Sequence, residues 1–303
     1  MPNFNRSASI VITEKDILNP VILPEVGPPE FIPGTPLNIS GLKIVFNVKK
    51  TLSTFSNSAR VDIYNLSKKA FDQIAIEDDL ILNAGYTDGA GEKLLFKGDI
   101  QKISREHSGT DIITKLQCDD GGLRLREIRG ELSRGKKVGV MQIICEILSA
   151  FGFPPRQPVD CKNKQYGSII DKQYLHGFSY VGSAREALSK LTERIGVEWS
   201  IQNSEAQLLL KGGVNLTPPI PVSSLNGMIG SPDSLDDVRG ELSLNKRASG
   251  WKVRSLINPE IEPGGRLKID SNTAKGEFRI EEVDHLGDTF GSDWQTIAQV
   301  TGL

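Results

Sequence analysis

Apolar and polar residues alternate along much of the chain, and this pattern predicts β-strands that each have one buried face. The clearest case is the run Arg60-Val61-Asp62-Ile63-Tyr64. Strands of this kind are predicted at 7–13, 42–48, 59–64, 80–85, 93–96, 98–105 and 111–118, with a short helix at 67–75. About six strands around one helix favour a small barrel or a closed sandwich.

A second series of strands is predicted near the C-terminal end of the chain, at 241–245, 250–256, 266–269, 276–285 and 294–300. The two series share a weakly similar order of residues. Phe96 begins a strand that is followed by Asp111, and Phe278 begins one that is followed by Asp293. This similarity suggests that one module is present twice. The alternative is that the similarity arose by chance, because the spacings differ by several residues.

Between the two series the apolar residues change to a helical period. They recur at helical spacing through 183–195, where Ser183 and Glu186 predict a capping box and Gly196 predicts the helix end. The period then returns to two, which predicts a strand. A second helix is predicted at 138–151. The middle of the chain is therefore expected to be α+β.

These patterns divide the chain into β regions at 1–122 and 213–303 and an α+β region at 123–212. The first region contains a proline-rich segment at 19–36, whose six prolines exclude a helix or a central strand. A loop of that length is typically either mobile or used for contact with a partner, and we favour contact.

Composition and charge argue against several functions. The hydrophobic fraction of 38% and charged fraction of 24% are ordinary for a globular protein. A net charge of −2 argues against a dedicated nucleic-acid binder. The longest apolar helical run, at 138–153, is too short to cross a bilayer, so no membrane insertion is expected. The absence of a secretory signal pattern and the three widely spaced cysteines favour synthesis in a reducing cytoplasm.

No motif in the sequence requires an active site. The stretch 130–137 matches a phosphate-binding loop until its last position, where Lys137 replaces the Ser or Thr that would bind Mg²⁺; we expect a basic surface loop. The three histidines lack metal-ligand spacing. Adjacent acids such as Asp119 and Asp120 are expected to point apart or into water. We therefore expect no cofactor, no metal and no enzymatic activity.

Several phrases of the sequence resemble baseplate hub proteins of contractile-tailed bacteriophages and Mu-like prophages. The phrases at 57–67, 84–86 and 95–100 resemble the first domain of that family, and 183–202 resembles its middle domain. The phrases LNGMIGSP at 225–232, RSLINPEIEP at 254–263 and DHLGDTF at 284–290, followed by Trp294, resemble its C-terminal domain. Their order and spacing carry the resemblance, which covers most of the chain from Asn57 onward.

The resemblance implies a structural hub in the phage virion. Such a hub is a homotrimer with two tube-like antiparallel β-barrels per subunit, joined by a smaller α+β domain. Its six similar units would connect a hexameric tail tube to a trimeric central spike, beside other baseplate proteins, and leave a channel for the transient passage of DNA. Candidate partner contacts lie in the proline-rich segment and in a basic span: Pro28, Pro29, Phe31, Arg124, Arg126, Arg129, Lys136 and Lys137.

Two other classes of function stay open. A tail-tube or tube-initiator protein would share the barrels but assemble as a hexamer. A baseplate cell-wall hydrolase would need two acids beside a groove, and the length of the chain leaves no segment for a fused hydrolase domain. Exposed acids at 78–79 and 236–237 are candidates for the channel wall, with solvated turns as the alternative.

Overall fold

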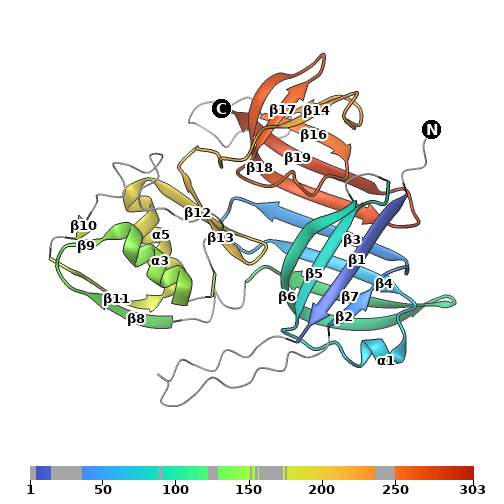
Figure 1. Cartoon of the computed structure of the whole chain (residues 1–303), viewed down its shortest axis with the longest axis horizontal. Coiled ribbons are helices and arrows are strands. Elements are labelled where there is room, and N and C mark those ends of the chain that lie inside the picture. The colour runs from blue at the N-terminus through green and yellow to red at the C-terminus, as the bar shows by residue number, and fades with distance from the viewer. Residues whose placement is uncertain are drawn as a thin grey trace.

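A computed structural model describes residues 5–14, 36–88, 91–121, 129–150, 152–153, 156, 173–174, 176–235 and 250–303. The N-terminal and C-terminal strands lie against each other, and a smaller portion with two helices lies to one side of them (Figure 1). We call these the β body and the middle portion. The predicted strand at 241–245 and the proline-rich segment except Pro36 lie outside the described residues.

Seven strands are formed by the residues of the N-terminal part of the β body that the structure describes. They are β1 (Arg6–Thr13), β2 (Leu37–Ile39), β3 (Ile44–Thr51), β4 (Ser58–Tyr64), β5 (Asp79–Tyr86), β6 (Gly91–Ser108) and β7 (Asp111–Asp119). Neighbours are antiparallel in the order β2-β1-β5-β6-β7-β4-β3. In β4 every second residue is buried, as the alternation predicts. The helix predicted at 67–75 is shorter in the structure, where α1 spans Lys68–Phe71.

The described residues of the C-terminal part form six strands, β14 (Ile220–Ser223), β15 (Asp233–Ser234), β16 (Gly250–Leu256), β17 (Arg266–Asp270), β18 (Lys275–Asp288) and β19 (Trp294–Gly302). Strand β14 runs parallel to β17 and was not predicted, because it lies in a proline-rich stretch. Among the described strands β14 pairs only with β17, and this edge position tolerates Pro221.

One long strand joins the two parts of the β body into a single sheet. The first half of β18 pairs with β17, and its second half, Glu282–Asp288, pairs with Val45–Thr51 of β3. The resulting sheet has 13 strands and an open order that ends at β15 and β2. The prediction of a mostly β, α+β chain is confirmed, but the predicted pair of closed barrels is not found among the described strands. The alternation predicted β18 correctly but contains no information on its partner β3.

In the part of the middle portion that the structure describes, two helices combine with three two-stranded ribbons. Its elements are β8 (Arg129–Arg134), β9 (Val138–Gly139), α3 (Val140–Ala150), β10 (Gln173–Tyr174), β11 (Phe178–Ser183), α5 (Ala184–Ile195), β12 (Val197–Gln202) and β13 (Glu205–Leu210). The ribbons are β8–β11, β9–β10 and β12–β13. The stretch that resembles a phosphate-binding loop is therefore mostly strand β8.

The start of α5 differs from the prediction. Ser183 occupies the N-cap position with an extended backbone, as the last residue of β11, but its side chain makes no capping bond. Glu186 instead accepts a hydrogen bond from the Tyr180 hydroxyl at 3.2 Å. The predicted end of the helix is confirmed, since Gly196 adopts the left-handed conformation with φ of 70°.

The described residues form three hydrophobic clusters, one in each part of the β body and one in the middle portion. The N-terminal cluster also contains Ile257 and Trp294, which come from the C-terminal part of the chain. The two parts of the β body therefore share core residues as well as a sheet. The domain boundaries at 122 and 212 stay predictions.

Candidate functional site

Polar side chains that are buried or partly buried gather where the two parts of the β body meet the middle portion. They come from β3, from the segments after β3 and β7, from the stretch between α3 and β10, from the β12–β13 turn and from the segment before β17. We call this group the junction cluster, and its members are Lys50, Asn57, Asp120, Arg156, Asn203 and Glu262.

Asp120 and Asn57 form one half of the junction cluster. The Asp120 carboxylate is fully buried and accepts hydrogen bonds from Asn57 N at 2.7 Å, Asn57 Nδ2 at 2.8 Å and Asn203 N at 3.2 Å. Asn57 Nδ2 also donates to the Ile201 carbonyl at 2.8 Å. Asn203 and Ile201 belong to the β12–β13 hairpin, so these bonds fix the middle portion on the β body.

Glu262 forms the other half and receives bonds from three directions. Lys50, which is fully buried in β3, places Nζ 3.3 Å from Glu262 Oε1. Asn203 Nδ2 donates to the same oxygen at 3.0 Å, and Arg156 pairs with Oε2. A single carboxylate thus joins the N-terminal strands, the middle portion and the C-terminal part of the chain.

Burial sets the protonation of these groups. It raises the pKa of Asp120 to about 8, although the hydrogen bonds from Asn57 and the charge of Lys50 oppose the shift. Burial also lowers the pKa of Lys50, despite the nearby carboxylate of Glu262. For Glu262, burial would raise the pKa, but the charges of Lys50 and Arg156 outweigh it and the pKa lies below its ordinary value.

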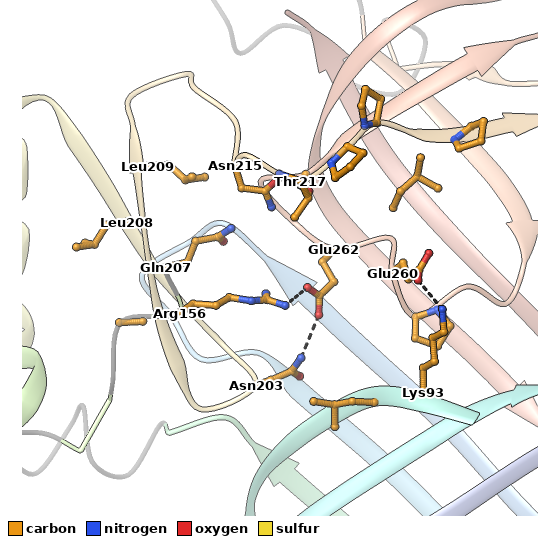
Figure 2. A pocket seen from close by; sticks show the side chains of 18 residues that line it. Lys93, Arg156, Asn203, Gln207, Leu208, Leu209, Asn215, Thr217, Glu260 and Glu262 are labelled. Atoms are coloured by element: carbon orange, nitrogen blue, oxygen red, sulfur yellow. Dashed lines mark hydrogen bonds and ion pairs between the residues drawn. The ribbon is translucent and has the colours of Figure 1, made fainter. Parts of the chain in front are cut away.

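A cleft of about 630 Å³ lies beside the junction cluster (Figure 2). Its walls come from the start of β6, from β13, from the segment 215–221 and from the segment 259–265. Its charged groups form pairs, because Lys93 Nζ lies 2.5 Å from Glu260 Oε1 and Arg156 contacts Glu262. Apolar groups form much of the wall: Leu94, Leu208, Leu209, Pro218, Pro219, Ile220, Pro221 and Pro259.

The fold has counterparts among solved structures of tail proteins. A tail protein from Neisseria meningitidis MC58 aligns with a TM-score of 0.62 and 9% identity over 98% of this chain and 97% of its own. A 43 kDa tail protein of prophage MuSo2 from Shewanella oneidensis also aligns with a TM-score of 0.62 and 9% identity, over 98% of this chain and 98% of its own. The chain has the fold of these tail proteins. No family model and no curated protein matches it.

A third counterpart belongs to a secretion system. The E. coli c3393 protein is described as a component of the type VI secretion system with structural similarity to the T4 tail proteins gp27 and gp5. It aligns with a TM-score of 0.54 and 10% identity over 86% of this chain and 73% of its own. The fold is therefore shared by the two tail proteins and by a component of the type VI secretion system.

The partner contacts predicted from the sequence stay predictions. Pro28, Pro29, Phe31, Arg124 and Arg126 lie outside the described residues, and only the backbone of Arg129 is described, in β8. Lys136 and Lys137 are exposed in the turn before β9. Lys137 has a φ of 63°, and its N–H donates to the Tyr174 carbonyl at 2.8 Å.

Two predictions about acidic residues can be compared with the structure. Asp119 and Asp120 were expected to point apart or into water; Asp120 is fully buried, whereas Asp119 is partly exposed. Asp78 was a candidate for an exposed channel wall, but it is buried and its carboxylate accepts a bond from Ala75 N at 2.8 Å. The sequence contained a sign that Asp120 is buried. It lies two residues after Cys118 and four after Leu116, and both of these face the core from β7. Asp236 and Asp237 lie outside the described residues.

Within the described part of the chain, no three His, Cys, Asp or Glu side chains gather as a metal site. The same residues contain no helix of the length and apolarity needed to span a membrane. His285 is fully buried, and burial keeps its pKa well below the ordinary value, so it is neutral. Its Nδ1 lies 2.9 Å from Thr296 Oγ1 between β18 and β19, which is a structural position.

The raised pKa of Asp120 predicts how stability depends on pH. Between about pH 4 and pH 8 the folded chain holds a proton on Asp120 that the unfolded chain releases, so the free energy of unfolding falls as pH rises. The slope for one proton is about 1.4 kcal/mol per pH unit. Urea denaturation from pH 5 to pH 9 measures it, and Asp120→Asn should flatten it.

The control for this prediction is Asp270→Asn, which changes an exposed carboxyl that pairs with Lys275. This variant should keep the pH slope of the wild-type chain. If Asp120→Asn keeps that slope as well, Asp120 does not titrate between these pH values.

Proposed function

We propose that the chain is the hub subunit of a phage tail baseplate. In this role three copies connect the hexameric tail tube to the trimeric central spike and surround a channel through which DNA passes. The observation that carries the proposal is a fold shared with two tail proteins over 98% of the chain. The role is structural, and the subunit is part of the virion.

Two similar hairpins support the idea of a repeated module. β6–β7 and β18–β19 each pair a long strand with the next strand in sequence, and each carries one register shift. The extra residue lies seven positions before the last residue of the long strand in both cases, at 101 before 108 and at 281 before 288. Three subunits with two such modules would present six similar units to a sixfold tube.

The continuous sheet gives this arrangement a mechanical basis. Because β18 pairs with both β17 and β3, the two modules of one subunit are held by backbone hydrogen bonds rather than by a linker. The junction cluster then fixes the middle portion against both modules. A subunit built in this way would keep one shape while its neighbours in the tail contract, which is what an adaptor between two symmetries requires.

Oligomeric state tests the proposal. Light scattering on the purified chain after size-exclusion chromatography should give three times the monomer mass. A mass six times that of the monomer would favour the alternative of a tail-tube or tube-initiator protein. A particle image with the subunit located between tube and spike would place it among the other baseplate proteins, and a location elsewhere would contradict the hub role.

The hydrolase alternative has a separate test. Paired acids beside a groove occur at the junction, where Glu260 and Glu262 line the cleft, but each is held by a cation. A zymogram with purified peptidoglycan should show no clearing by the wild-type chain. Clearing that is lost in Glu260→Gln would overturn the structural role.

A further inference from the structure

We propose that the cleft beside the junction cluster binds an extended, uncharged and apolar segment of another protein chain. The cleft is formed by all three portions of the molecule, and sites between such portions are common places for ligands. This inference goes beyond the hub role, and it can fail while the chain still forms a trimer.

Hydrogen-bond donors without acceptors point into the cleft. Gln207 is 5% exposed and its Oε1 accepts from Ser200 Oγ at 3.3 Å, whereas Nε2 finds no acceptor among the described residues. Asn215 Oδ1 accepts from Thr217 N at 3.2 Å and from Thr217 Oγ1 at 2.5 Å, and its Nδ2 likewise finds no acceptor in the described ranges. Figure 2 shows both side chains projecting toward the cleft that they line.

Arg156 adds a third donor to the same cleft. Its Nη2 contacts Glu262, but Nη1 is buried and has no partner in the described part of the chain. A buried donor without an acceptor is unfavourable by about the free energy of desolvating it, so Arg156 Nη1 favours a ligand that brings an acceptor. The amide nitrogens of Gln207 and Asn215 are further donors on the same wall. Backbone carbonyl oxygens of an extended polypeptide are acceptors at regular spacing.

The charges of the cleft exclude other classes of ligand. Each cation on the wall has a carboxylate partner, Glu260 for Lys93 and Glu262 for Arg156, so no cation is left to neutralise a phosphate. Each carboxylate is matched in the same way, which disfavours a cationic ligand. Nucleic acid and basic peptides are therefore poor occupants, and an uncharged segment is favoured.

The wall of the cleft supplies apolar contact. Four prolines and three leucines line it, and the exposed Leu94, at 41%, contributes to its rim. Leu216, at 60% exposure, lies between two lining residues in the sequence. Proline walls are rigid, so binding requires little ordering of the site, and exposed leucines beside a concave surface are typical of protein-binding sites.

A defined peptide tests the proposal. The peptide Ser-Leu-Pro-Leu-Ser-amide, with fluorescein joined to its N-terminal amine, should bind the full chain in an anisotropy titration, while the matched unlabelled peptide with Asp in place of both Leu should not compete. Inorganic phosphate should not compete either. Failure of the leucine peptide to bind the folded wild-type chain, or equal binding of the acidic peptide, would overturn the proposal.

Two nearly isosteric variants test the donors. Gln207→Glu and Asn215→Asp keep the acceptor oxygen that the structure uses and replace only the free amide nitrogen by oxygen. Each should weaken binding of the leucine peptide by about tenfold, the change expected for one lost hydrogen bond. Asn226→Asp, in the exposed turn after β14, adds the same charge outside the cleft and should bind like the wild type.

The outcomes separate the two proposals. Thermal denaturation of each variant establishes that it is folded, and light scattering establishes its mass. A trimer that binds the leucine peptide equally well in the wild type and in both cleft variants contradicts the cleft proposal and leaves the hub role intact. A chain that binds the peptide but is not a trimer contradicts the hub role alone.

Discussion

Glu262→Ala is expected to lower the free energy of unfolding by about 3–5 kcal/mol. The substitution removes the carboxylate that pairs with Lys50, whose side chain is fully buried at 3.3 Å from Glu262 Oε1. It also removes the acceptor for Asn203 Nδ2 and the partner of Arg156. Breaking a buried pair leaves an uncompensated charge, which is why the expected loss is large. Urea denaturation followed by circular dichroism at constant pH measures it.

A matched control lies two residues away. Glu260 also pairs with a lysine, but its side chain is 56% exposed and that of Lys93 is 42% exposed. Exposed pairs contribute about 0–1 kcal/mol, so Glu260→Ala should change stability little. Equal losses in the two variants would mean that burial of the Lys50 pair is not what makes Glu262 important.

A second substitution tests the stated cause. Replacing a buried ion pair by apolar groups is often close to neutral, so adding Lys50→Met to Glu262→Ala should recover part of the lost stability. If the double variant is less stable than Glu262→Ala, the uncompensated charge of Lys50 is not the source of the loss. Hydrogen exchange should then localise the damage to another part of the junction cluster.

The alternation of apolar residues predicted most strands because one face of each strand is buried. Its errors also have physical causes. Two strands were predicted at 93–96 and 98–105, but β6 is continuous through Gly98. A Cβ at Gly98 would meet the Asp119 carbonyl oxygen, so this glycine allows β7 to approach closely and does not end the strand.

The junction cluster was missed although the same alternation contains a signal for it. Ile44, Phe46 and Val48 are buried at every second position of β3, and Lys50 follows in the same phase. A charged residue on the buried face of a strand must have a buried partner. Its partner Glu262 lies 212 positions away, so the pairing depends on the sheet order and could not be obtained from local pattern.

The strand partner of β3 could not be predicted for a related reason. Both β3 and the second half of β18 read as strands with one buried face, and many registers satisfy that pattern. The choice is made by side chains that fit only in the assembled sheet. Phe46 of β3 lies against Gly287 of β18, where a Cβ would meet its ring. Trp294 lies against the same ring, with centroids 5.6 Å apart.

Trp294→Ala is therefore expected to destabilise both parts of the β body, by about 3–5 kcal/mol. Trp294 is 3% exposed and belongs to β19, yet it packs in the N-terminal core against Phe46 and Tyr86. Removing it leaves a cavity between two rings that the rigid sheet cannot close. Urea denaturation gives the loss, and hydrogen exchange should show faster exchange in β1 and β3 as well as in β19.

Two further variants make this prediction specific. Trp294→Phe keeps an aromatic ring and should lower the free energy of unfolding clearly less than Trp294→Ala does. The indole N–H of Trp294 has no partner among the described residues, so its removal breaks no hydrogen bond there. Trp251→Ala removes a half-buried indole that packs against the C-terminal cluster, so faster exchange should stay in β16 and β19. If Trp294→Ala leaves exchange in β1 and β3 unchanged, the two parts of the β body do not fold as one unit, and a rigid subunit joining two symmetries loses its physical basis.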